Sequence, residues 1–429
     1  MIKNNILIFI SLFSLQLSSQ EVLKSYIYSD GYSIIPRSIL QFPDEFIIPY
    51  SITKNEEKKA GILYLNKDNT INQAILFEGK DDYVINQIIP SSINNNLLIS
   101  AEGYSEQGQE SLYFLEIENQ QIVNEFVYNE GGNELDPFAI LEIGKNILIG
   151  GFIKSRELVS NSFYNMYSET QMIYVAEFTK KGKKIWSKGI NLKGYEKGIC
   201  NRMIMIDDDI VLLCHANKIG EEMSPFLLKI DSKGNVKNII QIYNKDFITI
   251  GSCLRQTESG LELSGSYSIS DKHYFYSTLF SSDLELLNNS EYHIPYRLSI
   301  NGITKDGTIY GSVIKDSDGY NNAIIKLSED GYSFLEFGNS KSDLLFGISK
   351  QINFSYSIGA SSENTSTFNI IKNDITLSNF KLLEKVNSKL KIKSKFNIEY
   401  ESDFIKSTIN KGVSKVKIKN VNNNFKSEL

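Results

Sequence analysis

The residues best suited to acid–base or metal chemistry near neutral pH are three histidines: His215, His273 and His293. His273 and His293 are 20 residues apart, and no HxH or HExxH pattern surrounds any of the three. Zinc sites need Cys, His or carboxylate ligands at short, fixed spacings, and none is present. A GxSxG nucleophile elbow is also missing, although a Ser/His/Asp set drawn from distant segments remains open. The sequence therefore predicts no catalytic residue and favours a protein that is not an enzyme.

Two acidic residues could bind calcium. Asp316 and Asp318 stand at alternate positions in the run Asp316–Asn321, as the oxygen ligands of a calcium loop do. The closing glutamate that such a loop needs at its twelfth position is missing. A polar hairpin turn explains the run better, so no cofactor is expected, with Ca²⁺ near Asp316 and Asp318 as the alternative.

Aromatic side chains gather in one inserted run, SRELVSNSFYNMYSETQ, which begins at Ser155. Loops carried on a rigid scaffold are frequent sites of binding. The prediction is a binding loop, with a loop folded over its own repeat as the alternative. Its proposed contact residues are Phe163, Tyr164, Met166 and Tyr167.

The elements that must position these residues recur along the chain. A β-rich run with small residues occurs seven times, with starts at Phe46, Asn96, Ile147, Ile210, Leu261, Thr308 and Phe354. Consecutive starts are 50, 51, 63, 51, 47 and 46 residues apart, and the insertion explains the spacing of 63. A second run with alternating apolar and polar residues follows each of them, the period of a half-buried strand. Sustained helical periodicity is missing after the first twenty residues.

Repeats of about 50 residues that each supply four antiparallel strands are typical of β-propeller blades. The predicted fold is therefore all-β: a seven-bladed β-propeller of four-stranded antiparallel blades over residues 21–388, after an N-terminal signal peptide. The segment from Val22 to Tyr28 is expected to add a strand to the last blade and so to close the ring. An array of β-sandwiches or a β-helix is the structural alternative.

The third copy carries a family resemblance. The runs ILIGGFIKS from Ile147 and YVAEFTKKGKKIW from Tyr174 resemble secreted β-propeller repeats of exported bacterial proteins, and the ending LSSQ resembles Bacteroidetes-type signals. The resemblance extends over roughly residues 30 to 388. It implies a binding or scaffolding platform with no particular ligand. The segment from Gly182 to Trp186 is similar to a blade-docking motif of quinoprotein propellers, which implies that Trp186 packs between neighbouring blades.

Export is predicted from the first twenty residues, which combine Lys3, an apolar core and a small polar end. Secretion, the periplasm or the cell surface is the expected location. The chain has three cysteines, Cys200, Cys214 and Cys253, and an odd number leaves at least one thiol unpaired in an oxidising compartment. Three buried thiols are expected, with one disulfide as the alternative.

The last segment, residues 389–429, has a different composition. It contains ten lysines and four acidic residues, a net charge of +6 within a chain of net charge −6. Lysine alternates with isoleucine or valine, which predicts strands with one charged face. Outward lysines protect sheet edges from unwanted pairing, and attachment to an acidic partner or an anionic surface is the alternative role.

The overall charge and a pI of about 5.4 argue against nucleic-acid binding. No segment reaches the roughly 20 apolar residues of a membrane-spanning helix. The favoured function is therefore an exported, non-enzymatic module that binds a protein or glycan, as a monomer or within a hetero-complex. A hydrolase or lyase with carboxylates and tyrosines at the central funnel is one alternative. An accessory subunit of an envelope-assembly or secretion machine is the other.

Overall fold

The computed structural model describes strands and the turns between them. It covers residues 23–29, 33–54, 57–68, 70–78, 82–104, 110–130, 133–160, 165–218, 220–243, 248–304, 306–315, 319–328, 331–337, 343–351, 354–361, 367–374, 381–387, 390–394, 396, 398–401, 407–410, 417–420 and 425–428. All regular elements within these ranges are strands, as the alternating pattern predicts. The predicted signal peptide, residues 1–20, lies outside the described residues.

The first three four-strand units follow the chain in order, with neighbouring strands antiparallel. Their strands are β2 (Ser33–Pro36), β4 (Glu45–Lys54), β5 (Glu57–Asn66) and β6 (Ile71–Glu78); β7 (Asp82–Pro90), β8 (Leu97–Tyr104), β9 (Glu110–Glu118) and β10 (Gln121–Glu130); and β11 (Glu134–Ile143), β12 (Asn146–Ser160), β13 (Asn165–Thr179) and β14 (Lys184–Leu192). The short β3 (Leu40–Gln41) pairs with β4.

The other four units continue the pattern. Their strands are β15 (Lys197–Ile206), β16 (Asp209–Asn217), β17 (Ser224–Ile230) and β18 (Val236–Tyr243); β19 (Ile248–Thr257), β20 (Gly260–Ile269), β21 (Lys272–Phe280) and β22 (Leu286–Ile294); β23 (Arg297–Ile303), β24 (Ile309–Lys315), β25 (Gly319–Ser328) and β26 (Gly331–Phe337); and β27 (Asp343–Gln351), β28 (Phe354–Ser361), β29 (Thr367–Asp374) and β1 (Leu23–Ser29). One parallel pair, Gln171 with Lys197, joins the third and fourth units into a ten-stranded sheet.

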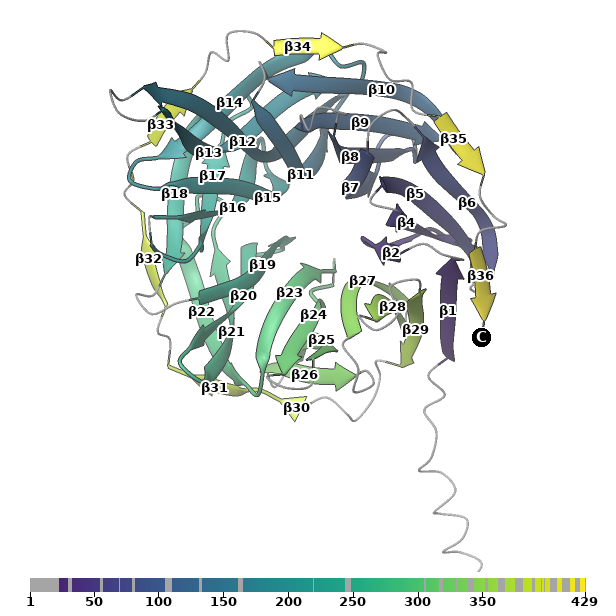
Figure 1. The fold of residues 1–429 in the computed structure, drawn as a ribbon. Helices are drawn as coiled ribbons and strands as arrows, with labels where there is room; N and C mark the ends of the chain where they lie inside the picture. The colour runs from purple at the N-terminus through teal and green to yellow at the C-terminus, as the bar shows by residue number, and fades with distance from the viewer. Residues whose placement is uncertain are drawn as a thin grey trace, which may run out of the picture.

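The sheets stand side by side around a central opening (Figure 1). The first strand of each unit lies nearest the opening, and the fourth lies at the perimeter. Every repeated run found in the sequence falls in the second strand of a unit, and its alternating partner forms the third. The antiparallel all-β fold is thus confirmed. The predicted pairing of the N-terminal segment with the last repeat is present too, because β1 pairs with β29.

Each hydrophobic cluster of the described core is shared by two consecutive units. The cluster around Ile62 and Ile99 combines residues of β4–β6 with residues of β7–β9. Four further clusters join the second unit to the third and so on to the sixth. A single sheet has two faces and its own residues cannot cover both. Packing unit against unit therefore supplies the core.

Hairpin turns between the third and fourth strands dock on the preceding unit. Gly182 has a φ of +82° and lies against the ring of Phe126, and Gly234 has a φ of +75° and lies against the ring of Trp186. The indole Nε1 of Trp186 donates a hydrogen bond of 3.1 Å to the carbonyl oxygen of Ser232 in the next unit. Trp186 therefore packs between neighbouring units, as its motif implies.

Replacing Gly234 tests this contact. A β-carbon there would lie 2.6 Å from Trp186 Cζ3. We expect Gly234→Ala to lower the free energy of unfolding by about 2–4 kcal/mol, from a left-handed backbone and an overpacked contact. The matched control is Gly220→Ala, since Gly220 has the same φ of +75° with no heavy atom within 4 Å. Its expected cost is about 1 kcal/mol. Urea unfolding followed by the fluorescence of Trp186, the one tryptophan of the chain, measures both variants; equal costs would contradict the account.

The three cysteines are unpaired and buried, as expected. Cys200 and Cys214 face each other across β15 and β16. Burial raises the pKa of the Cys214 thiol, and it raises the pKa of Cys253 to about 12. The thiols of Cys214 and Cys253 therefore remain protonated within the core.

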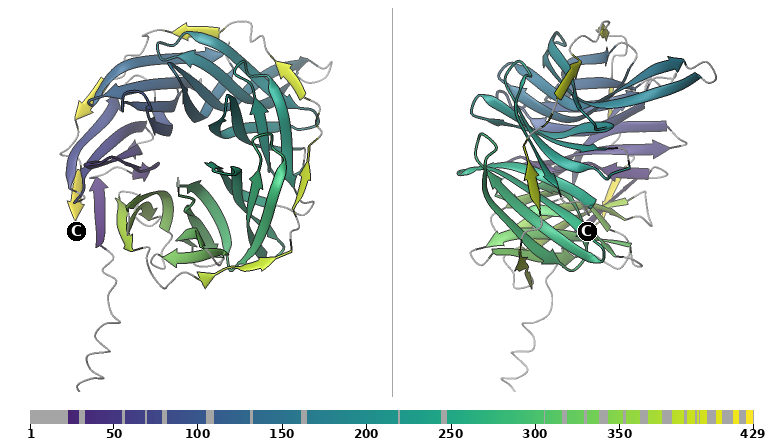
Figure 2. Two further views of the ribbon diagram at one scale, coloured as in Figure 1. Left: turned by 180° about the vertical axis from the view of Figure 1, so that it is seen from behind. Right: turned by 90° about the vertical axis from the view of Figure 1, so that its left-hand side faces the viewer.

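The C-terminal segment adds a fifth strand to every unit, which the sequence did not predict. Its strands are β30 (Lys381–Leu382), β31 (Glu384–Val386), β32 (Lys391–Lys393), β33 (Ile398–Glu401), β34 (Ser407–Asn410), β35 (Lys417–Asn420) and β36 (Phe425–Glu428). They pair in turn with β26, β22, β18, β14, β10, β6 and β1. The segment therefore passes around the perimeter against the chain order of the units (Figures 1 and 2).

We call residues 381–428 the perimeter segment. Along β32, Lys391 and Lys393 are exposed and Ile392 is half-buried, which matches the predicted charged face. Each of its strands pairs with the outer edge of a unit, where backbone N–H and C=O groups would otherwise meet solvent. The segment begins at Lys381, eight residues before the composition changes at Lys389.

Removing the perimeter segment should expose those edges. We expect a chain ending at residue 380 to self-associate, because an unpaired edge strand is a template for another chain. Sedimentation velocity over a range of concentrations measures the effect against the full chain. Far-ultraviolet circular dichroism controls for retention of the sheets. A truncated chain that keeps its sheets and sediments as the full chain does would contradict this role.

Candidate functional site

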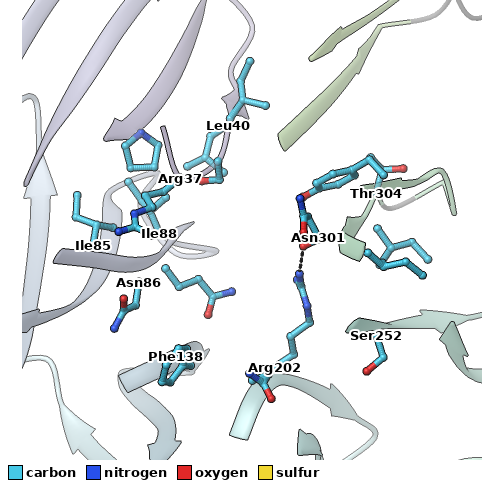
Figure 3. Close-up of a pocket in the computed structure, with 18 of the residues that line it drawn as sticks. Arg37, Leu40, Ile85, Asn86, Ile88, Phe138, Arg202, Ser252, Asn301 and Thr304 are labelled. Carbon is cyan, nitrogen blue, oxygen red and sulfur yellow. Dashed lines mark hydrogen bonds between the residues drawn. The ribbon is translucent and has the colours of Figure 1, made fainter. Parts of the chain in front are cut away.

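A cavity of about 910 Å³ lies at the central opening. Among the described residues, its lining comes from the first six units: the β2–β4 connection with β3, the strand β4, the innermost strands β7, β11, β15, β19 and β23, the neighbouring β16 and β24, and the β23–β24 turn. Ligand pockets occupy roughly 300–1,000 Å³ and combine apolar walls with a few placed polar groups. Figure 3 shows the pocket with apolar side chains such as Ile88 and Phe138 beside arginine and amide groups.

Backbone bulges aim side chains at this pocket. The pairing of the innermost strand with the second strand shifts register in six units. In three of them the residue that the strand register skips is an asparagine: Asn86, Asn201 or Asn301. A bulge turns one side chain away from the alternation of its strand. These asparagines line the pocket for that reason, while Cys200, the residue before Asn201, stays buried in the core.

Two arginines reach the pocket from different units (Figure 3). Arg202 Nη2 donates a hydrogen bond of 2.6 Å to the carbonyl oxygen of Asn301, and Arg37 Nε donates one of 3.2 Å to Ser51 Oγ. Burial lowers the pKa of Arg37, and the charge of Glu102 opposes this shift. Among the described residues, no carboxylate lies within ion-pair distance of either guanidinium. Within the part of the chain that the structure describes, these two positive charges therefore have no direct counter-ion.

A series of hydrogen-bonded polar side chains connects the fourth and fifth units at the pocket wall. His215 Nδ1 lies 2.7 Å from Asn201 Oδ1, and Ser252 Oγ lies 2.9 Å from His215 Nε2. The amide oxygen of Asn201 can only accept, so Nδ1 carries the proton and Nε2 accepts from the Ser252 hydroxyl. Burial lowers the pKa of His215 to about 4. The imidazole is therefore neutral near pH 7.

Ser252, His215 and Asn201 are hydrogen-bonded in the order that a nucleophile, a base and a group that orients the base would have. A base with a pKa of about 4 takes up a hydroxyl proton poorly, because an effective general base has a pKa near the working pH. The orienting group is an amide, which adds no charge to stabilise an imidazolium. Ser252 is also 8% exposed. The geometry favours a link between β16 and β19 over nucleophilic catalysis.

The buried imidazole of His215 makes the folding stability of the protein depend on pH. The folded-state pKa of about 4 lies below the ordinary 6.5, so the unfolded chain binds the proton more readily between these values. The contribution of His215 to folding stability is therefore full above pH 6.5 and is lost as pH falls toward 4. We expect the wild type to lose about 1–3 kcal/mol more than His215→Gln across this window. Urea unfolding of both proteins at several pH values measures it, and parallel curves would contradict it.

The candidate binding and calcium-binding residues predicted from the sequence do not lie at the central pocket in the described structure. Phe163 and Tyr164 lie outside the described residues, as do Asp316 and Asp318. Met166 and Tyr167 belong to β13, paired with Val159 and Leu158 of β12. Much of the insertion therefore lengthens a hairpin instead of forming a loop. From Ser155 onward β12 pairs with β13 alone, so the hairpin extends past its unit.

The other two histidines do not line the pocket. His273 Nδ1 lies 2.8 Å from Ser268 Oγ, and the ring of His293 meets Tyr274 edge to face at 6.0 Å. No group of three or more His, Cys, Asp or Glu side chains suited to a metal ion occurs among the described residues.

Sequence reasoning missed the pocket residues, although a weak signal exists. An asparagine with an apolar residue directly before it and another two positions after it recurs in three innermost strands, as INQI from Ile85, CNRM from Cys200 and INGI from Ile300. An isolated polar residue inside an apolar strand run indicates a bulge or an inward-facing site. Nothing in the sequence distinguishes Arg37 and Arg202 from the other arginines.

Comparisons with known proteins show structural similarity without a sequence family. No family model matches the sequence. No curated protein matches it either. Two structures of the plexin A4 full extracellular region align with TM-scores of 0.44 and 9% identity, over 80% and 81% of this chain. This chain spans 47% and 40% of those chains, less than half of each. The tail fiber of Staphylococcus aureus phage P68 aligns with a TM-score of 0.18 and 7% identity, over 84% of this chain and 98% of the fiber chain.

The described part of the chain has no helix of the length and apolarity needed to cross a bilayer.

Proposed function

We propose that the chain is a seven-bladed β-propeller that works as an exported, non-enzymatic binding module, and that its central pocket takes an acidic group of a glycan. Seven four-strand units, cores shared between consecutive units and the pairing of β1 with β29 support the propeller. Export follows from the signal-like character of residues 1–20.

The single observation that carries the binding function is the pair Arg37 and Arg202 at the pocket. A guanidinium presents several N–H donors in a plane, which match the two oxygens of a carboxylate. Holding such charges partly out of water costs free energy when no anion is near. A bound carboxylate offsets that cost, so the pocket is suited to an anionic group.

The rest of the lining suits a sugar chain. Amide groups of Asn86, Asn201 and Gln87 lie beside the apolar side chains of Ile88 and Phe138. Sugars present hydroxyl groups that pair with amides and C–H faces that pack on apolar surfaces. A volume of about 910 Å³ is at the upper end of the range for small-molecule pockets and accommodates more than one sugar ring.

Isothermal titration calorimetry with a galacturonic acid tetramer and its neutral galactose counterpart tests the proposal. We expect the acidic tetramer to bind and the neutral one to bind more weakly. Arg37→Gln and Arg202→Gln should each weaken acidic binding about 10- to 100-fold, since a hydrogen bond to a charged group contributes about 1.5–3 kcal/mol.

The matched control is Arg297→Gln, because Arg297 is exposed and does not line the pocket. It should bind as the wild type does. Equal binding of both tetramers, or unchanged affinity of both pocket variants, would contradict the proposal. Preferential binding of an acidic peptide would assign the pocket to a protein ligand.

The two alternative functions receive less support from the described residues. Among the described residues, Asp306 is the one carboxylate of the pocket lining, and it accepts hydrogen bonds from Thr304 and Thr308, so these residues supply no second group for paired-carboxylate hydrolysis. An assembly subunit that captures a partner strand needs an open sheet edge. The perimeter segment pairs with the outer edges of the units.

A further inference from the structure

We propose that the central pocket takes up a proton at His215 when it binds its anion, and that this proton turns the hydroxyl of Ser252 toward the ligand. This role rests on the proposed function, because it concerns the same binding event. Asn201, His215 and Ser252 all line the pocket, so the hydrogen bonds that join them lie at the wall that a ligand meets. His215 is a positioning residue, since it acts through Ser252.

The neutral imidazole of His215 has both ring nitrogens engaged within the wall. Nδ1–H donates to Asn201 Oδ1 at 2.7 Å, and Nε2 accepts from the Ser252 hydroxyl at 2.9 Å. The hydroxyl hydrogen of Ser252 therefore points at the imidazole. In this arrangement Ser252 donates to His215 and not to a ligand.

Protonation of the imidazole reverses the bond between His215 and Ser252. With a proton on both nitrogens, Nε2 can only donate, so the Ser252 oxygen accepts from it. The hydroxyl hydrogen then turns away from the ring, toward the pocket that Ser252 lines. The bond to Asn201 is kept, because Nδ1 donates to the amide oxygen in both states. One proton from solvent thus adds a positive charge and a hydroxyl donor to the pocket wall.

A bound anion favours this protonation. Burial lowers the pKa of His215 to about 4, because the charged imidazole loses hydration in the wall. Among the described residues, no carboxylate forms an ion pair with His215 that would offset this loss. A carboxylate of the ligand beside the ring raises the pKa, since an opposite charge stabilises the protonated form.

Other titratable groups surround His215. They are Cys200 and Arg202 on β15, Cys214 on β16, Cys253 on β19, Tyr310 on β24, and Asp306 and Arg37 elsewhere in the pocket lining. Burial raises the pKa of Cys214, Cys253 and Tyr310, so these three stay neutral in mildly acidic solution. The arginines stay charged. Asp306 is a carboxylate that takes up protons in acid, so a variant of His215 must separate the two.

The sign of the pH dependence follows from the two states of His215. Between its pKa in the free protein, about 4, and its higher pKa in the complex, the complex holds more protons than the free protein. Affinity for the anion therefore rises as pH falls through this range and levels off below it. Protonation of the ligand's own carboxyl group acts in the opposite direction, because it removes the negative charge, so it cannot imitate the effect.

Calorimetric titration of the full chain with the galacturonic acid tetramer at pH 5 and pH 7.5, in two buffers of different ionisation enthalpy, tests the role of His215. We expect about tenfold tighter binding at pH 5, with uptake of about one proton per tetramer bound. Uptake at pH 7.5 should be close to zero. The ring protons of His215, followed by nuclear magnetic resonance in the wild type, should titrate at higher pH when the tetramer is bound.

Variants separate the two residues. In His215→Gln, proton uptake should be lost and affinity should be equal at the two pH values, because glutamine does not titrate. Ser252→Ala should keep proton uptake but bind about tenfold more weakly at pH 5, with little change at pH 7.5. The matched control is His293→Gln, since His293 is exposed and does not line the pocket. It should behave as the wild type does.

The outcomes distinguish this role from the function on which it rests. If the wild type prefers the acidic tetramer to neutral galactose tetramer yet takes up no proton at pH 5, the role of His215 is overturned and the proposed function stands. Undiminished uptake in His215→Gln, or ring protons of His215 that titrate alike with and without ligand, would also overturn it. Equal weakening of Ser252→Ala at both pH values would overturn the turning of the hydroxyl. Equal binding of the two tetramers would contradict the proposed function itself.

Discussion

A four-stranded antiparallel sheet with two apolar faces cannot keep both of them out of water by itself. In this chain every described core cluster is shared by two consecutive units, and each unit contributes residues to the clusters on both of its faces wherever these are described. The contacts that stabilise one unit are therefore also the contacts that fix the angle to its neighbour. The arrangement around a central opening follows from this sharing (Figure 1).

The shared core also explains why the functional groups lie where they do. Innermost strands are held on both faces, and a bulge turns a side chain out of their alternation toward the opening. Bulges at Asn86, Asn201 and Asn301 provide such departures. The chain from Asn201 through His215 to Ser252 shows that the same groups connect units as well as line the pocket. The bulge at Asn201 therefore serves both the packing of units and the lining of the pocket.

The sequence predicted the repeated strands well because their signal is local. Strands such as β5 and β17 show the same alternation of apolar and polar residues in every copy. Turn glycines such as Gly182 and Gly234 recur because a short hairpin turn requires a positive φ. Trp186 was predicted correctly from a motif whose chemistry, an aromatic ring against a tight turn, is also local.

The pocket and the perimeter segment were beyond prediction because both depend on distant pairing. Arg202 of β15 and Asn301 of β23 belong to different units, and they meet only because the chain between them folds into its own sheets. The perimeter strands are two to four residues long, so their own pattern is weak and an existing sheet edge decides where they pair. The insertion was predicted as a loop, yet its backbone continues the ladder of β12 and β13, because strand pairing outweighed its polar composition.

Hydrogen exchange of the amides of β1, measured in the intact chain, tests the central claim most directly. β1 is paired on one edge with β29 of the last repeat and on the other with β36 of the perimeter segment. If units and segment form one continuous arrangement, both sets of β1 amides should exchange as slowly as those of the central strand β16. Exchange of β1 at the rate of an unstructured peptide would contradict the account.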